Sequence, residues 1–157
     1  MLKIQKLKEE DISDCLKIVV ETRAACNRDE AKWLMELSLK KLRHVLKPEY
    51  HVLFEDGKLI GISGLYQDYE DPETARWLDY LAVTPRKQRL GHGTMMLENL
   101  ETICRKKKVE HLCVFTDNQK AINFYTKHGF EIVGKIDHYF SQSEPKVWLC
   151  KKLTSIP

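Results

Sequence analysis

Apolar and polar residues alternate at the start of the chain, where residues 2–7 place Leu2 and Ile4 on one face of a half-buried strand. The acidic residues at positions 9–11 suit the first turn of a following helix. The apolar residues of that helix recur at helical spacing and would form one buried stripe: Ile12, Cys15, Leu16 and Val19. The pattern therefore predicts a strand and then a helix.

A second apolar stripe at helical spacing ends before Pro48, which cannot continue a helix. Its members are Met35, Leu39, Leu42 and Leu46. Asp29 is placed to cap the first turn, because a side-chain oxygen at that position accepts a backbone N–H. The pattern predicts a second helix that packs into the core.

Three segments of strand-like composition come next, at residues 51–55, 58–66 and 75–83. Asp56-Gly57 lies between the first two and is a strong hairpin signal. Pro72, in an acidic loop, separates the second from the third. These tight connections predict an antiparallel meander.

A helix is expected after the glycines at positions 91 and 93. Its buried side would contain Met96, Leu97, Leu100, Ile103 and Cys104. Its water-facing side would contain Glu98, Asn99, Glu101 and Thr102.

A short apolar strand is expected at residues 111–115, followed by a helix that contains Tyr125. Asp117 or Thr116 is expected to cap this helix. Gly129 would supply the left-handed residue that ends it, with Phe130 packing over the last turn. Residues 131–136 and 146–153 are expected to form two final strands.

The element order is strand, two helices, three strands, helix, strand, helix and two strands, which predicts an α+β or mixed α/β sandwich. A length of 157 residues, 43% of them hydrophobic and 31% charged, suits one domain over residues 1–157. No run approaches the about 18 apolar residues of a membrane helix, and the first ten residues lack a signal peptide's apolar core. We therefore expect a cytoplasmic protein with no membrane partner.

The cysteines and histidines suggest neither a disulfide nor a metal site. The five cysteines are odd in number and contain no C-x-x-C pair, so we expect reduced thiols. They are Cys15, Cys26, Cys104, Cys113 and Cys150. The six histidines show no H-E-x-x-H or other ligand spacing, so we expect no metal.

The basic run at residues 105–108 invites a nucleic-acid interpretation. It ends a predicted helix, however, where cations favour the helix dipole. No aromatic residues interleave with it to stack on bases. The formal net charge of +3 is too small to define a partner, so we expect no nucleic-acid partner.

The most informative stretch runs from Asp79 to Thr94, where an apolar strand leads into a basic, glycine-bearing turn that opens a helix. Gly91 and Gly93 let the backbone turn sharply and approach a ligand closely. The first N–H groups of a helix have no intrahelical partner and suit an anion such as phosphate. Further donors surround this point: Arg86, Lys87, Arg89 and His92. Such a turn can also serve connection only.

Two common phosphate motifs do not fit this turn. A P-loop needs Lys followed by Ser or Thr after its second glycine, whereas Thr94-Met95 follows Gly93. The dinucleotide fingerprint needs a third glycine where Met96 stands. The remaining pattern, Gln88-x-x-Gly91-x-Gly93 after a strand, resembles the coenzyme A loop of the GCN5-related N-acetyltransferase (GNAT) superfamily.

A second motif, residues 117–130, resembles the other signature of that superfamily and follows in the same order and separation. The matching residues are Asn118, Ala121, Phe124, Tyr125, Lys127, Gly129 and Phe130. The resemblance implies a GNAT-like mixed, mostly antiparallel sheet of about seven strands, flanked by about four helices.

The resemblance also implies acetyl-CoA as co-substrate. In this fold two strands splay apart, here residues 79–83 and 112–115, and the pantetheine arm pairs with the backbone between them. Residues 81–83 would contact the arm by main chain, and residues 89–94 would hold the pyrophosphate. The implied cofactor-binding residues are Leu81, Ala82, Val83, Gln88, Arg89, Leu90, Gly91, His92, Gly93, Thr94, Asn118 and Phe124.

Tyr125 matches the tyrosine that protonates the departing thiolate in many members of this superfamily. A phenol with a pKa of about 10 can donate a proton to a sulfur anion of basicity near that of cysteine, about 8.5. The alternative is that Tyr125 is only an aromatic core residue beside Phe124.

The general base is expected at Asp79. N-terminal acetyltransferases of the ribosomal-protein type carry a glutamate at the place that matches Cys113, where this chain has no carboxylate. Other members place the base on the earlier strand, on the face shared by Trp77 and Asp79, of which only Asp79 is titratable. The alternative is that Asp79 is only a strand-edge carboxylate, or one bonded to a nearby backbone group.

We therefore expect an N-acetyltransferase that moves an acetyl group from acetyl-CoA to a primary amine of a small molecule or peptide by direct attack. The alternative is a non-catalytic acyl-CoA-binding sensor or interaction module on the same fold. The helical region with Trp33 and Met35 would either pack in the core or help wall the acceptor pocket. The acceptor and the oligomeric state, with a homodimer as one option, are left open.

Overall fold

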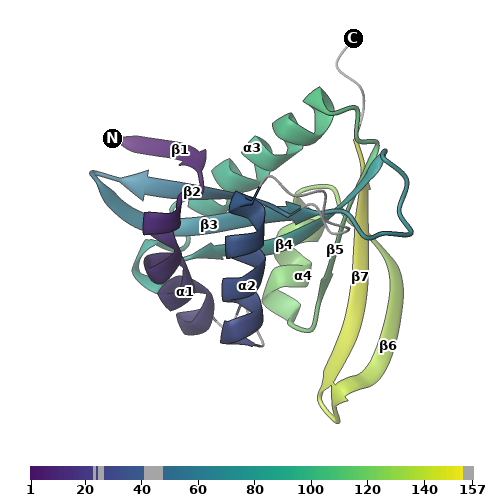
Figure 1. Cartoon of the computed structure of the whole chain (residues 1–157). Helices are drawn as coiled ribbons and strands as arrows, with labels where there is room; N and C mark the ends of the chain where they lie inside the picture. Colours follow the sequence, from purple (N-terminus) through teal and green to yellow (C-terminus); the bar gives the residue numbers. More distant parts are fainter. Residues whose placement is uncertain (23, 25–26, 41–47, 154–157) are drawn as a thin grey trace.

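The computed structural model describes residues 1–22, 24, 27–40 and 48–153 and contains a seven-stranded sheet (Figure 1). The strand order is β1-β2-β3-β4-β5-β7-β6, and only β4 and β5 pair in parallel. The strands are β1 (Leu2–Lys6), β2 (Glu49–Glu55), β3 (Lys58–Tyr66), β4 (Ala75–Val83), β5 (His111–Thr116), β6 (Glu131–Ser141) and β7 (Glu144–Lys152). The mixed, mostly antiparallel sheet confirms the predicted α+β class.

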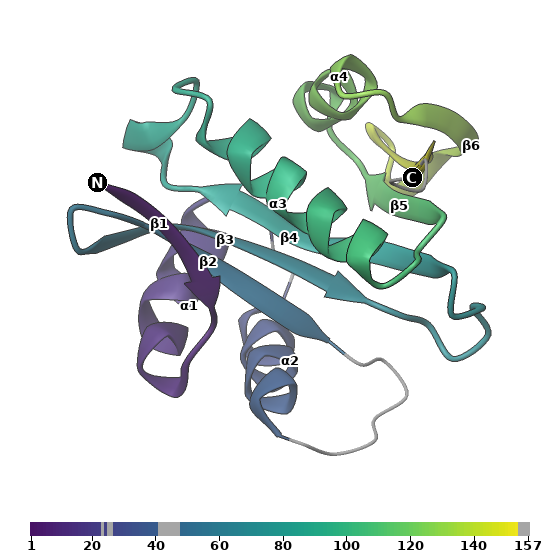
Figure 2. The same cartoon turned by 90° about the horizontal axis from the view of Figure 1, so that it is seen from above.

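Four α-helices cover the sheet from two sides, namely α1 (Ile12–Glu21), α2 (Arg28–Leu39), α3 (His92–Lys106) and α4 (Gln119–Lys127). Figures 1 and 2 show α1 and α2 on one face and α3 and α4 on the other. Val52 and Ile62 belong to the core under α1 and α2, whereas Leu78 and Leu112 belong to the core under α3 and α4. None of the helices in the described ranges is long and apolar enough to cross a membrane.

The caps of two helices differ from those predicted. Asn27, rather than Asp29, caps α2, because its side-chain oxygen accepts the N–H groups of Asp29 at 2.9 Å and Glu30 at 3.2 Å. Asn118, rather than Thr116 or Asp117, caps α4 by accepting the N–H of Ala121 at 2.7 Å. An amide oxygen serves this role as well as a carboxylate does.

The buried stripes of α2 and α3 also differ in part from those predicted. In α2 the buried residues are Ala31, Met35 and Leu37, whereas Leu39 is the last residue of the helix and is exposed. Leu42 and Leu46 lie outside the described residues. In α3, Glu101 is only 6% exposed, although it was predicted to face water. Its carboxylate is neutralised by Arg105 at 2.9 Å and by Lys151 of β7 at 2.6 Å.

The last two strands form a longer hairpin than the sequence predicted. β6 continues to Ser141 and β7 begins at Glu144, so both run past the predicted limits near their turn. Figure 1 shows this hairpin extending beyond the rest of the sheet. The sequence did not predict this extension, because residues 137–144 are exposed and do not alternate between solvent and a core.

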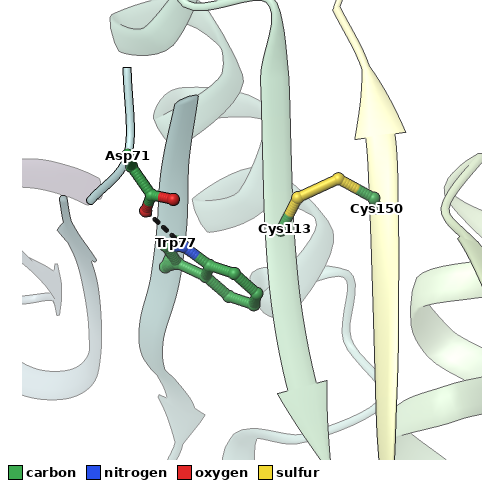
Figure 3. Close-up of a disulfide and its surroundings, with 4 residues drawn as sticks. All are labelled: Asp71, Trp77, Cys113 and Cys150. Carbon is green, nitrogen blue, oxygen red and sulfur yellow. Dashed lines mark hydrogen bonds between the residues drawn. A yellow bond between two sulfur atoms is a disulfide. The ribbon is translucent and has the colours of Figure 1, made fainter. Parts of the chain in front are cut away.

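The prediction that all cysteines are reduced was wrong for Cys113 and Cys150, which form a disulfide between β5 and β7 (Figure 3). The two residues stand directly opposite each other in the β5–β7 register, with their Cα atoms 4.1 Å apart. They are 37 residues apart in sequence, so only the strand register brings them together. Cys15 and Cys104 are buried free thiols.

Candidate active site

Strands β4 and β5 separate after a short stretch of pairing. Their parallel ladder joins residues 75–77 to residues 111–113 and goes no further. A cavity of about 270 Å³ lies where they have diverged. Its lining residues come from β4, β5, α4 and the end of α1, and include Asp79, Leu81, Ala82, Val83, Gln88, Phe115, Asn118 and Tyr125. The splayed strands that the resemblance implied are therefore present, with an open space between them.

The turn after β4 presents the N-terminus of α3 to one end of this space. A 3₁₀ turn, Pro85–Lys87, precedes Arg89 and Gly91, which both have positive φ, at 61° and 84°. Gly91 occupies the N-cap of α3, so the next N–H groups, of His92, Gly93 and Thr94, open the helix. A Cβ at Gly93 would lie 3.6 Å from the ring of Phe124, which shows that this glycine faces α4. The backbone is thus arranged to receive an anion.

Several polar side chains of this turn brace the loop itself. Gln88 donates its amide N–H to the Val83 carbonyl at 2.9 Å. His92 is buried, with Nδ1 2.9 Å from the Lys87 carbonyl, and Lys87 forms an ion pair with Glu55 at 2.5 Å. Exposed Arg86 and Arg89 have no ion-pair partner in the described part of the chain. Those two arginines, together with the backbone, are therefore available to an anion.

His128 joins the first turn of α3 to the end of α4, a contact that no sequence spacing indicated. Its Nδ1 lies 2.7 Å from the Phe124 carbonyl, so Nδ1 carries the proton and donates it. Its Nε2 lies 3.0 Å from the Thr94 hydroxyl and accepts from it. The imidazole also packs on the Phe124 ring, with centroids 4.4 Å apart. His128 therefore holds Thr94 and Phe124 in place beside the turn.

Asp79 reaches the cavity from a bulge in β4. The register places Ser63 opposite Leu81 and Leu65 opposite Leu78, so two residues of β4, Asp79 and Tyr80, oppose one residue of β3. The Asp79 carboxylate accepts a hydrogen bond from the Tyr50 hydroxyl.

Burial raises the pKa of Asp79 to about 6, the Tyr50 hydrogen bond opposes this rise, and the charge of Glu30 adds to it. Asp79 is therefore ionised at neutral pH yet basic for a carboxylate. Tyr50 was not singled out from the sequence, because its role depends on strand pairing.

Tyr125 lines the same cavity from α4. Its ring is buried between Phe124 and Phe130, with centroid distances of 5.3 Å and 5.2 Å. Burial raises the pKa of Tyr125. Within the described residues its hydroxyl has no hydrogen-bond partner. It is a protonated phenol with a free donor beside the cavity.

The remaining residues considered for the site from the sequence lie outside the cavity. Met35 is fully buried in the core under α1 and α2, and Trp33 is half exposed. Neither lines the cavity, whose N-terminal wall is instead made by Thr22 and Ala24. Trp77 donates its indole N–H to Asp71 at 2.7 Å, beside the Cys113–Cys150 disulfide (Figure 3). In the described ranges, no three His, Cys, Asp or Glu side chains gather as metal ligands.

Comparison with known proteins decides the family. Residues 12–130 match the model of the acetyltransferase (GNAT) family. The chain belongs to this family. The GNAT resemblance of its two motifs and the predicted GNAT fold are thereby confirmed.

Relatives of this GNAT chain are named as N-acetyltransferases. Spermine/spermidine N(1)-acetyltransferase of Bacillus subtilis (strain 168) is 33% identical over 93 residues, which cover 54% of this chain and 60% of the relative. N-alpha-acetyltransferase 50 of Danio rerio is 41% identical over 126 residues, which cover 68% of this chain and 75% of the relative. An aminoglycoside 6'-N-acetyltransferase, solved in complex with coenzyme A, shares the fold, with a TM-score of 0.82, 15% identity and 99% coverage of both chains.

Proposed function

We propose that this GNAT chain transfers an acetyl group from acetyl-CoA to a primary amine by direct attack of the amine. The observation that carries the proposal is the cavity between β4 and β5, which brings a basic carboxylate, Asp79, and a protonated phenol, Tyr125, to one space. A base and an acid on opposite sides of a reacting centre are what amide formation from a thioester requires.

The residues present fit acetyl-CoA. The unpaired edge of β4 at residues 81–83 offers backbone groups to the pantetheine arm, and the N-terminus of α3 with Arg86 and Arg89 offers donors to the pyrophosphate. A protein of the same fold was solved in complex with coenzyme A, which supports coenzyme A as the kind of ligand. When bound, acetyl-CoA supplies an acyl group activated as a thioester. Asn118 and Phe124 would act indirectly, by capping α4 and by packing against Gly93.

Asp79 would bind the acceptor as an ammonium and take its proton, directly or through water. An amine of pKa about 10.4 is neutral in only about one molecule in 2,500 at pH 7, which costs about 4.6 kcal/mol. A carboxylate with a pKa of about 6 cannot deprotonate such an amine outright. It lowers the cost by holding the amine where the proton is lost as the new bond forms.

Tyr125 would give its proton to the departing thiolate. Burial raises the pKa of thiols in this protein, that of Cys15 to about 12 and that of Cys104 to about 11. A thiolate that leaves inside the protein is therefore a stronger base than one in water. Burial raises the pKa of the Tyr125 phenol as well, so the donor and the accepting thiolate shift in the same direction and burial does not by itself prevent the proton transfer.

Acetyl-CoA binding is expected to stabilise the fold by about 2.7 kcal/mol when its concentration is a hundred times the dissociation constant. Gly91→Ala is expected to weaken this response, because the new Cβ stands at the turn where the anion is held. A tenfold loss of affinity would leave about 1.4 kcal/mol at the same concentration. Thermal unfolding with and without acetyl-CoA measures both values.

Gly57→Ala is the matched control. Gly57 and Gly91 have nearly equal positive φ, 79° and 84°, and a Cβ at either would meet no atom within 4 Å. Both variants should therefore lose similar intrinsic stability, yet only Gly91→Ala should lose its response to acetyl-CoA. Equal responses in the two variants would contradict the pyrophosphate role of the turn, and no stabilisation of the wild type would remove the cofactor proposal.

A panel of amines tests the acyl transfer itself. Thiol release from acetyl-CoA that depends on an added amine would support an enzyme and identify the acceptor class. The named relatives suggest starting with polyamines, aminoglycosides and peptide α-amines. Tight acetyl-CoA binding with no thiol release for any amine would favour a sensor module instead.

A further inference from the structure

The ring of Tyr50 crosses one strand to reach a residue on the next. Tyr50 lies on β2, directly opposite Gly64 of β3, and its hydroxyl donates a hydrogen bond to Asp79 of β4. A Cβ at Gly64 would lie 2.3 Å from the Tyr50 ring and 3.3 Å from the Asp79 Cβ. Only glycine, whose side chain is a hydrogen atom, leaves room at position 64 for the Tyr50 ring.

The surroundings of Tyr50 fix the position of its ring and keep its hydroxyl protonated. It is 2% exposed, and its ring stacks on Tyr80 with centroids 6.0 Å apart and planes 13° from parallel. Burial and the neighbouring Asp79 raise the pKa of Tyr50, so its hydroxyl stays protonated and donates. The β4 bulge turns Asp79 to the side of the sheet where Tyr50 lies. The strand register, the absence of a side chain at Gly64 and the stacking on Tyr80 together fix the hydrogen bond from Tyr50 to Asp79.

Few charged or titratable groups act on Asp79 in the described part of the chain. Tyr50 of β2 donates to the carboxylate, and Glu30 of α2 repels its charge. Tyr66 of β3 and Tyr50 both have pKa values raised by burial and by Asp79, so both are neutral. Of these groups, Tyr50 alone favours the ionised carboxylate.

We propose that Tyr50 is a positioning residue for acetyl transfer, which acts across Gly64 to orient the Asp79 carboxylate toward the cavity and to keep it ionised. The inference rests on the proposed role of Asp79 as the base. Without the Tyr50 hydroxyl, a larger fraction of the carboxylate would be protonated at neutral pH, and the carboxylate would lose its fixed direction.

Tyr50→Phe removes the hydroxyl and keeps the ring. A hydrogen bond to a charged group is worth about 1.5 to 3 kcal/mol, so the titration midpoint of Asp79 is expected to rise by about one pH unit or more. Carbon-13 NMR of the aspartate carboxyl groups measures this midpoint in the protein alone. In the acid limb of kcat/KM the same shift should lower the rate at pH 6 about fivefold relative to the alkaline plateau.

Tyr66→Phe is the matched control, because it also deletes one hydroxyl near Asp79 but no hydrogen bond to it. Its Asp79 midpoint should stay at the wild-type value. If the Asp79 midpoint in Tyr50→Phe also stays there, the inference is overturned. If the midpoint rises while the acid limb of the rate does not move, Asp79 is not the base and the catalytic role of Tyr50 falls with it.

Gly64→Ala tests the crossing by a second route. The new methyl group must displace the Tyr50 ring, so stability should fall and the Asp79 midpoint should rise as in Tyr50→Phe. In a Tyr50→Leu background the ring is gone, and the stability cost of Gly64→Ala should shrink. An undiminished cost in that background would contradict the crossing. The proposed function is tested separately: if it is wrong, the wild type itself will show no acetyl transfer.

Discussion

Replacing Asp79 by asparagine is expected to stabilise the fold at neutral pH by up to about 3 kcal/mol while slowing acetyl transfer. The folded-state pKa of Asp79 is raised from 3.8 to about 6, mainly by burial. Ionisation of this group therefore opposes folding, at about 1.36 kcal/mol for each unit of pKa difference. Asparagine carries no charge and can still accept the Tyr50 hydrogen bond.

The sign of the pH dependence follows from the raised pKa. Below pH 3.8 the carboxyl is neutral in both states, so wild type and Asp79→Asn should differ little in stability. As the pH rises from 3.8 through about 6, the wild type loses stability, because burial opposes the ionisation of Asp79 in the folded state; the variant does not lose it. Urea unfolding of both proteins at pH 4, 5, 6 and 7.5 should show a gap that opens over this range. A constant gap would mean that Asp79 titrates normally.

The effect on activity has its own pH signature. The variant should lose most of its rate near pH 7 and less at pH 9, where the acceptor amine is already more neutral. Steady-state kcat/KM against pH for both proteins measures this. A loss that is uniform with pH, or no loss, would reject Asp79 as the base and favour an acceptor of low pKa.

Tyr125→Phe is expected to lower kcat about a hundredfold or more, because it removes the proton donor for the thiolate and keeps the ring between Phe124 and Phe130. Affinity for acetyl-CoA should change little, since the proton is needed only as the C–S bond breaks. Single-turnover kinetics and acetyl-CoA titration separate the two quantities.

The control for this variant is Tyr139→Phe, which deletes an exposed hydroxyl on β6. Its turnover should equal that of the wild type. Unchanged turnover in Tyr125→Phe would assign Tyr125 to packing alone, whereas parallel loss of turnover and cofactor affinity would assign it to binding.

Local patterns predicted much of this fold. Strand-like composition identified the strands at residues 51–55, 58–66 and 75–83, Asp-Gly identified the hairpin between the first two, and the positive φ of Gly129 ends α4 as expected. These features depend on neighbouring residues, so a single sequence contains them. The sequence did not identify the residue that caps α2, because Asn27 and Asp29 both have suitable side chains and lie only two positions apart. The backbone conformation determines which of them caps the helix.

The remaining features depend on which strands pair and in what register. The Cys113–Cys150 disulfide, the burial of Glu101 beside Lys151 and the crossing of Tyr50 over Gly64 each join residues far apart in sequence. The same holds within the candidate site. Asp79 and Tyr125 could be proposed from the motifs that contain them, but Tyr50 and His128 matter through contacts that no motif records.

The most direct test of the proposed function is the stoichiometry of acetyl transfer. Purified protein is mixed with acetyl-CoA and the best amine of the panel, free CoA thiol is titrated, and the N-acetylated amine is quantified by mass spectrometry. We expect one molecule of N-acetyl product for each thiol released, at a rate far above that without protein and reduced in both Asp79→Asn and Tyr125→Phe. Thiol release without N-acetyl product, or no release with any amine despite acetyl-CoA binding, would contradict the proposed function.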